Sequence, residues 1–283
     1  MAMTNIIPEI WAKTILALLE KSLVAARIAN RTIAGEVAVK GDQLHIIGAG
    51  AVATGDYGAS ANITYETVSD AVNTLTVNLD KYFAFKVEDS EKRQANVPWQ
   101  QIYAERGTYE LRDDIDTLLF AEYASAGLDS YETGTTPWQL GAAGADVPTL
   151  MAALAKQLND ADAPQEGRFF AMPTICLQAF QLYFASRSTN LGDTVLANGA
   201  LGRAFGFDLF VSRNVGGSTT LHGLAGVYGH SIAYAQQVNP SSIEELRAEG
   251  RFASLVRGRV LAGIKTFRSG TSIDVNLNST LLA

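Results

Sequence analysis

The stretch TLTVNLDKYFAFKVED, residues 74–89, decides the fold class of this chain together with the segment that follows it. Leu75, Val77 and Leu79 alternate with polar residues, and an aromatic run extends the pattern to Val87. A period of two is typical of a half-buried strand, because successive side chains point to opposite faces. We therefore predict a long strand here.

The next segment, WQQIYAERGTYELRDDIDTLLFAEYASA at residues 99–126, has a helical period instead. Its apolar stripe consists of Leu111, Ile115, Leu118, Leu119 and Tyr123. Pro98 suits the start of a helix. At a rise of about 1.5 Å per residue the helix would be roughly 40 Å long. A strand followed by so long a helix predicts an α+β fold in an elongated molecule with a helical spine.

Upstream of the strand, residues 35–95 are rich in β-branched and aromatic residues and are interrupted by glycines. Residues 42–47 are predicted as a second strand, whereas residues 48–62 are rich in glycine and alanine and have little to bury. The whole predicts a long two-stranded excursion with a loose tip. A lone hairpin is marginally stable in water, so we expect it to lie on another surface.

The amino-terminal residues 4–31 carry a short apolar stripe at helical spacing. The stripe consists of Ile10, Trp11, Ile15, Leu18, Leu19 and Leu23. It fits an arm that packs on a partner and equally an ordinary first helix, and the pattern favours neither. Glu20, Lys21, Arg27 and Arg31 interrupt the apolar run, so we expect no membrane span and no signal peptide.

Downstream of the long helix, residues 129–146 are predicted as a linker, followed by a compact α/β region. Asp146 is predicted as the N-cap of a helix that has Pro148 in its first turn. The predicted helices are 147–158 and 174–184, and the predicted strands are 168–172, 206–211, 223–228 and 251–264.

The chain has 283 residues, of which 47% are hydrophobic and 18% charged, so it can bury a large core. Its net charge of −7 argues against a protein that grips nucleic acid, because phosphate binding needs clustered Lys and Arg. A protein that encloses nucleic acid without holding it stays compatible with this charge. An acidic inner wall would let DNA slide during packing.

The single cysteine, Cys176, lies in an apolar run. It can form no intramolecular disulfide, which fits assembly in a reducing cytoplasm. We interpret it as a small buried hydrophobe and not as a catalytic thiol.

Gly48-Ala49-Gly50 follows an apolar strand and resembles the start of a dinucleotide-binding fingerprint. The third glycine is replaced by Ala53, and the segment 54–58 disfavours the helix that phosphate binding requires. We interpret the stretch as a loop.

The three histidines, His45, His222 and His230, have no metal-binding spacing and are interpreted as surface or core residues. The carboxylates Glu110, Asp113, Asp114 and Asp116 are interpreted as a solvated helix face or a salt-bridge surface between subunits. We therefore predict no catalytic, cofactor-binding or metal-binding residues, no cofactor and no enzymatic activity.

Four motifs, in order along the chain, resemble those of tailed-bacteriophage major capsid (coat) proteins with the Hong Kong 97-like fold. They are IIPEIW at residues 6–11, GDQLHI at 41–46, LDKYFAFKVED at 79–89 and NGALGRAFGFD at 198–208, the last followed by Ser212 and Asn214. Together they cover most of the chain, although each alone is a weak signal.

The resemblance implies an α+β capsid fold with an N-terminal arm, an extended β-hairpin loop, a peripheral domain with a long spine helix, and an axial domain. The implied division is 1–34 for the arm, 35–95 for the loop and its flanking strands, 96–145 for the peripheral domain, 146–235 for the axial domain, and 236–283 for a return to the peripheral domain.

It also implies a virion protein, made in the host bacterial cytoplasm, whose copies form hexamers and pentamers of an icosahedral head around double-stranded DNA. The expected partners are further copies of the chain, a separate scaffolding protein and the portal. Residues 41–80 contain no lysine, so the covalent crosslink of some relatives is not expected. Noncovalent burial or a decoration protein would then strengthen the shell.

Two alternatives stay open at this point. The first keeps the fold and makes the chain an encapsulin-like nanocompartment shell. The second is a small-molecule enzyme with an α/β core at residues 146–235, which a deep pocket with convergent polar groups would support.

Overall fold

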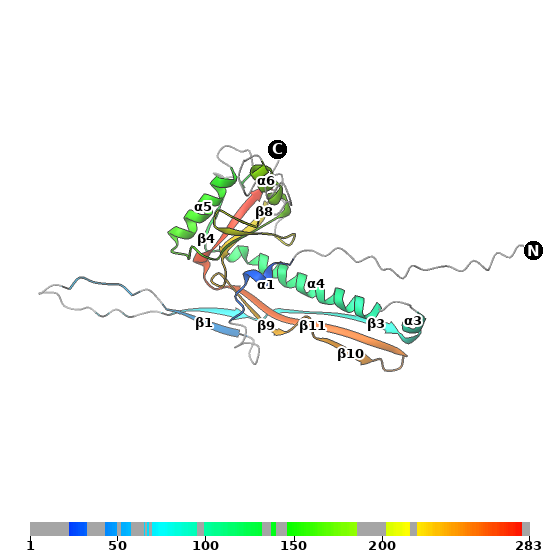
Figure 1. The fold of residues 1–283 in the computed structure, drawn as a ribbon. Helices are drawn as coiled ribbons and strands as arrows, with labels where there is room; N and C mark the ends of the chain where they lie inside the picture. Colours follow the sequence, from blue (N-terminus) through cyan, green and yellow to red (C-terminus); the bar gives the residue numbers. More distant parts are fainter. Residues whose placement is uncertain are drawn as a thin grey trace, which may run out of the picture.

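The structure is a computed structural model that describes most of the chain. The described residues are 23–32, 43–49, 52–57, 65, 67, 70–94, 99–131, 137–139, 146–185, 202–215 and 220–278. They form an elongated half, which carries a projecting ribbon, and a compact half (Figure 1).

The elongated half is built around one long helix on an antiparallel sheet (Figure 1). It comprises α4 (Trp99–Ala121), β3 (Leu79–Glu88), β9 (Ile232–Val238), β10 (Ile243–Arg247) and β11 (Ala253–Thr266), with the short α3 (Asp89–Gln94) after β3. β11 is the organising strand, because β3, β9 and β10 all pair with it.

The apolar stripe predicted on the long helix packs against this sheet. Leu111 and Leu119 of α4 are buried in one cluster with Val260 and Ile264 of β11. The predicted helix at 99–126 is confirmed: α4 ends at Ala121 and continues as the 3-10 turn η1 (Glu122–Ser125).

Two glycines allow α4 to approach the sheet closely across the ring of Phe83. A Cβ atom on Gly107 of α4 or on Gly258 of β11 would lie 2.5 Å from that ring, which is closer than atoms can pack. The aromatic side chain of β3 therefore fills the layer between helix and sheet because both neighbours lack a side chain.

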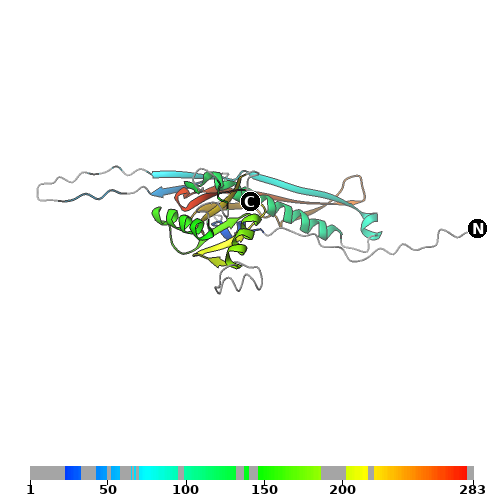
Figure 2. The same ribbon diagram turned by 90° about the horizontal axis from the view of Figure 1, so that it is seen from above.

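A two-stranded ribbon projects from the elongated half (Figures 1 and 2). It pairs β1 (Gln43–Ala49) with β2 (Asp70–Thr76) antiparallel along their whole length. At its base, Leu75 is fully buried against Ala233 and Ala235 of β9. The predicted strand at 42–47 is confirmed, and β1 and β2 form the two-stranded part that was predicted. The prediction of one long strand over residues 74–89 is wrong, because the chain leaves the ribbon after Thr76 and continues from Leu79 as β3 in the other sheet.

The compact half contains a six-stranded sheet in the order β4-β12-β8-β5-β7-β6. Its strands are β4 (Leu128–Tyr131), β5 (Arg168–Met172), β6 (Arg203–Ala204), β7 (Phe207–Val211), β8 (Thr220–Val227) and β12 (Ser272–Asn278). Two helices, α5 (Val147–Asp160) and α6 (Thr174–Ala185), belong to this half. The predicted helices and strands of this region are confirmed within a few residues.

The core of the compact half is closed. Trp138, Phe170, Phe180 and Phe207 are fully buried in one cluster with the apolar face of α5. β5 pairs parallel with β7, and α6 lies between them in sequence. That arrangement is a crossover connection, which needs a helix-sized segment to return the chain to the same edge.

Three further predictions need correction. Residues 128–131 form the strand β4, so the predicted linker at 129–146 starts with a sheet strand. Asp146 is at the N-cap position of α5, but its side chain makes no capping hydrogen bond. β12 pairs with β8 and β4 in the compact half, although residues 236–283 were expected to return to the peripheral sheet, as β10 and β11 do.

The described amino-terminal residues pack on the body of the chain itself. Val24 and Ile28, at the short helix α1 (Ala25–Ile28), are buried against α4, and Asn30 forms a bridge with Ala233 of β9. This favours the first-helix reading for residues 23–32. The rest of the predicted stripe, Ile10 to Leu19, lies outside the described residues.

Candidate functional site

A buried carboxylate, Asp116, joins three parts of the chain. Its side chain is fully buried on α4. It accepts hydrogen bonds from the backbone N–H of Val24 at 2.7 Å, the Ser212 hydroxyl at 3.2 Å and the Asn214 side-chain amide at 3.1 Å. The amino-terminal segment, the long helix and the loop after β7 therefore meet at one carboxyl group.

The interpretation of the carboxylate cluster as a solvated or intersubunit face is wrong for Asp116. Asp113 accepts a hydrogen bond from Asn214 at 2.6 Å, and Asp114 pairs with Lys81 of β3. Of the cluster, only Glu110 is exposed. Leu119 and Phe120, three and four residues after Asp116, are fully buried, so Asp116 lies on the packed side of the helix.

A buried carboxylate is tolerated when hydrogen bonds replace its lost hydration. Asp116 meets that condition with donors from distant segments, and Ser212 and Asn214 are the residues that close the last capsid-like motif. We assign Asp116 a positioning role, in which it fixes the loop after β7 and the amino-terminal segment on the spine helix.

His222 forms a second junction between the two halves. Its ring nitrogen Nδ1 lies 3.1 Å from the carboxylate of Asp274 on the neighbouring strand β12. Its ring stacks on Tyr123 of η1, with 4.0 Å between the ring centroids. His222 is thus a packed, partnered residue and not a surface filler.

The other histidines lie apart from this junction. His45 bonds Thr74 across the ribbon at 3.0 Å, and His230 is exposed in the turn after β8. Within the described ranges, no group of three His, Cys, Asp or Glu side chains could hold a metal ion. In the same residues, no helix is long and apolar enough to cross a bilayer.

Cys176 is fully buried on α6, and this burial raises the pKa of its thiol far above the usual value. The reactive thiolate is therefore disfavoured, as expected for a small buried hydrophobe. β1 runs through Gly48 to Ala49, and residues 52–57 form no helix and are exposed. Gly50 lies outside the described residues.

Large apolar side chains are exposed on the ribbon and on the segment between its strands. Tyr65 is 92% exposed, Tyr57 78%, Val52 67% and Val72 55%. A monomer in solution would leave all of them in water. Because these side chains all lie on one projecting segment, they favour an interaction surface there.

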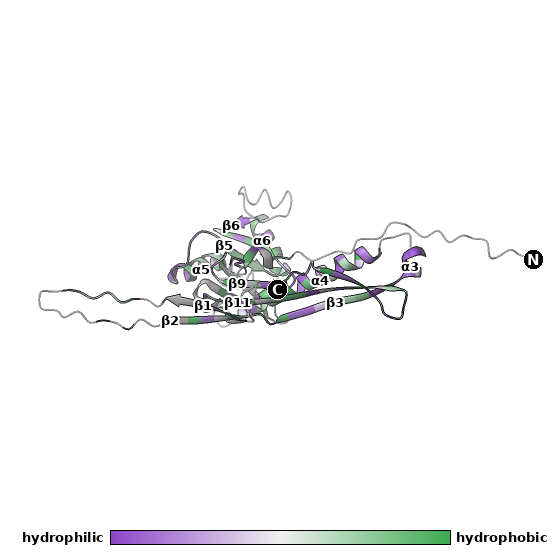
Figure 3. Ribbon diagram, turned by 90° about the horizontal axis from the view of Figure 1, so that it is seen from below, coloured by the Kyte–Doolittle hydropathy of each residue, from purple (hydrophilic) through white to green (hydrophobic). Residues whose placement is uncertain are grey.

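Hydrophilic residues occur along the sheet of the elongated half, as the purple segments of β3 show (Figure 3). Ion pairs connect such residues on the face that points away from α4. Arg259 pairs with Asp80, and Arg257 pairs with Glu244. A hydrogen bond from the Arg259 guanidinium holds the pKa of the Asp80 carboxyl below its usual value. Tyr82 and Leu255 are exposed among these charges. Exposed ion pairs add little stability. This face is therefore a polar surface that contributes little to the stability of the fold.

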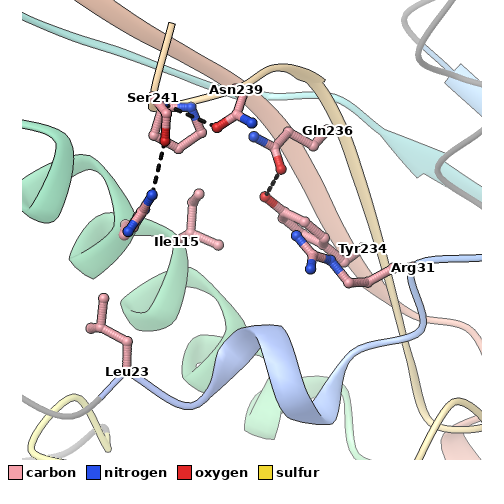
Figure 4. Close-up of a pocket in the computed structure, with 9 residues that line it drawn as sticks. Leu23, Arg31, Ile115, Tyr234, Gln236, Asn239 and Ser241 are labelled. Atoms are coloured by element: carbon pink, nitrogen blue, oxygen red, sulfur yellow. Dashed lines mark hydrogen bonds between the residues drawn. The ribbon is translucent and has the colours of Figure 1, made fainter.

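A cavity of about 380 Å³ lies between the amino-terminal segment, α4 and the strand β9 (Figure 4). We call it the Arg31–Arg112 pocket. It is lined by Leu23, Arg31, Arg112, Ile115, Tyr234, Gln236, Asn239, Pro240 and Ser241.

Hydrogen bonds and stacking hold the polar side chains of this pocket in place. Arg112 donates to the Ser241 hydroxyl at 2.8 Å, and the Tyr234 hydroxyl donates to Gln236 at 2.8 Å. The Arg31 guanidinium lies over the Tyr234 ring, 5.6 Å from its centroid. Burial raises the pKa of Tyr234 to about 12, so its hydroxyl keeps its proton at neutral pH.

Solved structures of phage particles are similar to this chain over nearly its whole length. A chain from Mycobacterium phage Che8 has a TM-score of 0.82 at 24% identity, covering 96% of this chain and 98% of that chain. A chain from the capsid of cyanophage P-SCSP1u has a TM-score of 0.73 at 14% identity, covering 97% and 94%. A chain from the capsid of a native GTA particle has a TM-score of 0.69 at 13% identity, covering 98% and 97%.

No protein-family model matches the chain, and no curated protein matches it either. The similarity is thus one of three-dimensional structure at low sequence identity. Since it extends over both halves and the ribbon, the chain has the α+β fold of phage capsid proteins, as its motifs implied.

Proposed function

We propose that this chain is the major capsid protein of a tailed bacteriophage, which assembles as hexamers and pentamers into an icosahedral head around double-stranded DNA. The observation that carries the proposal is the structural similarity to phage and GTA capsid chains over at least 96% of the chain. The exposed apolar residues of the ribbon and its loop support it, because a neighbouring copy would cover them.

The arrangement also supports a purely structural role. The groups that could carry chemistry are engaged in packing or hydrogen bonding: Asp116 with three donors, His222 with Asp274, and Cys176 in the core. The three similar structures named above come from phage and GTA particles. We propose that the chain has no catalytic activity of its own.

In the proposed head, residues 1–34 act as the arm, and the segment with the β1–β2 ribbon acts as the extended loop. The elongated half around α4 and β11 acts as the peripheral domain, and the compact half, whose sheet includes β4 and β12, acts as the axial domain. The proposed partners are further copies of the chain, a scaffolding protein, the portal and a decoration protein. The acidic net charge of −7 fits a wall that encloses DNA without binding its sequence.

Electron microscopy of the expressed full-length protein tests this proposal, with sedimentation as a second measurement. We expect closed particles or capsomer-sized rings over a range of salt concentrations, with or without a scaffolding protein. Stable monomers under all of these conditions would contradict it. A phage head should contain DNA when it is purified from infected cells. Particles that contain a single host enzyme and no DNA would instead support a nanocompartment shell.

A further inference from the structure

The Arg31–Arg112 pocket contains two cations and no acid. None of its nine lining residues is Asp or Glu. Among the described residues, no ion pair includes Arg31 or Arg112. The chain as a whole has 29 acidic and 22 basic residues, so two guanidinium groups in an acid-free cavity are not a reflection of composition. Both arginines are exposed, so an anionic group from outside the pocket can reach their guanidinium groups.

The remaining walls of the pocket are apolar. Leu23, Ile115, Pro240 and the ring of Tyr234 line it. A second hollow, which shares Leu23, Arg112 and Ser241, continues along α4 past Thr108 and Tyr109 to Glu105, so the acid of this groove lines the second hollow and not the Arg31–Arg112 pocket. The groove therefore suits a peptide segment that presents a carboxylate beside an aromatic or aliphatic side chain.

Residues 52–57, Val-Ala-Thr-Gly-Asp-Tyr, present such a pair. We call this segment the distal loop. All six residues are exposed, and Asp56 and Tyr57 are adjacent in sequence. No described residue forms an ion pair with Asp56. The distal loop lies beyond the outer end of β1 and points away from the body, so the pocket of its own chain is out of reach (Figures 1 and 2).

We propose that the distal loop of one copy docks in the Arg31–Arg112 pocket of a second copy. The two guanidinium groups bind the Asp56 carboxylate, and the Tyr57 ring packs on the apolar wall. This inference rests on the proposed shell function and names one of its contacts. Such a contact is heterologous, because loop and pocket are different surfaces, and repeating it generates rings or lattices.

A charge exchange tests this contact in the full-length protein. We expect Asp56→Arg and Arg112→Glu each to raise the protein concentration needed for half-maximal particle formation by about tenfold or more, since each leaves like charges opposed. The double variant Asp56→Arg/Arg112→Glu should recover to within about threefold of the unaltered chain, because the pair is restored with reversed sign. Thermal melting of each variant shows whether the monomer is intact.

Arg112 also bonds Ser241, so Arg31→Glu provides a second pocket variant if Arg112→Glu melts early. The matched control is Glu166→Arg, the same kind of reversal at another exposed acid. Combined with Arg112→Glu, it should give no recovery.

Each other outcome overturns the contact. Neutral single variants, or a double variant no better than the singles, would mean that loop and pocket do not meet. Recovery of Arg112→Glu by Glu20→Arg would assign the pocket to the amino-terminal segment of the chain. If the unaltered chain forms no particles, the proposed function is contradicted, and the contact that rests on it is contradicted as well.

Discussion

The compact half buries most of its large aromatic side chains, whereas the β1–β2 ribbon and its loop expose theirs. In the compact half, Trp138, Phe170 and Phe207 are fully buried within the chain, whereas on the ribbon and its loop Tyr57 and Tyr65 face water. The difference indicates that the compact half contributes to the stability of the monomer, whereas the ribbon and its loop leave apolar surface that the proposed contacts between copies would cover.

The largest expected effect is a charge in the core between α4 and the sheet of the elongated half. Leu119 is fully buried, so Leu119→Asp would bury an unpaired carboxylate on the spine helix. We expect it to lower the free energy of unfolding by at least about 3 kcal/mol and to prevent soluble folding. Tyr65→Asp on the ribbon should leave monomer folding intact. Soluble yield and thermal melting compare the two, and a cooperatively melting Leu119→Asp protein would mean that the stripe is misassigned.

The next effect concerns the junction at Asp116. Asp116→Ala would leave the donors from Val24, Ser212 and Asn214 without their acceptor. We expect a loss of about 3 kcal/mol, with Asp116→Asn losing less because one acceptor oxygen remains. Chemical denaturation measures both variants. Equal stability of Asp116→Ala and the unaltered chain would contradict the positioning role.

A smaller change in the free energy of unfolding is expected for Gly107→Ala, and its sign is informative. Helix propensity alone predicts that Gly107→Ala stabilises the chain by about 1 kcal/mol. The new Cβ would meet the Phe83 ring at 2.5 Å, so we expect destabilisation by about 1–3 kcal/mol instead. Phe83→Leu should relieve part of that loss in the double variant. A stabilised single variant would show that helix and sheet are not packed as closely as described here.

The ion pairs on the outer sheet face should matter little and should depend on pH. The pKa of Asp80 is lowered by Arg259, so the pair stabilises the fold above the ordinary carboxyl value of 3.8 and the contribution is lost as pH falls through the lowered value. Asp80→Asn should therefore melt slightly below the unaltered chain at neutral pH, and the two should converge in acid. A difference in melting temperature that grows as the pH falls would contradict a stabilising Asp80–Arg259 pair.

Local sequence patterns were sufficient to predict the helices and strands that have a marked local signal. The spine helix has an apolar stripe, β5 and α6 lie on either side of Pro173, and β7 follows Gly206; all four were predicted close to their observed bounds. The strand β10 was not recognised, because all five of its residues are exposed and it has no apolar alternation. β12 does alternate, but its place in the compact half depends on its pairing with β8, more than forty residues earlier in the chain.

The same limit explains the candidate site. Asp116 looked like one member of an exposed acidic cluster, since its partners Val24, Ser212 and Asn214 are more than ninety residues away in sequence. Helical spacing shows which side chains share a face, but it cannot show what that face meets. Only the resemblance, which singled out Ser212 and Asn214, carried a signal toward this junction.

The contrast between closed core and open ribbon is tested most directly by deleting residues 50–59, which follow the end of β1 and include the distal loop. Ten residues would still connect Ala49 to Asp70, and the entropic cost of closing a connection changes only slowly with its length. We therefore expect an unchanged melting temperature together with loss of particles in electron microscopy. Normal particles from the shortened chain would contradict it.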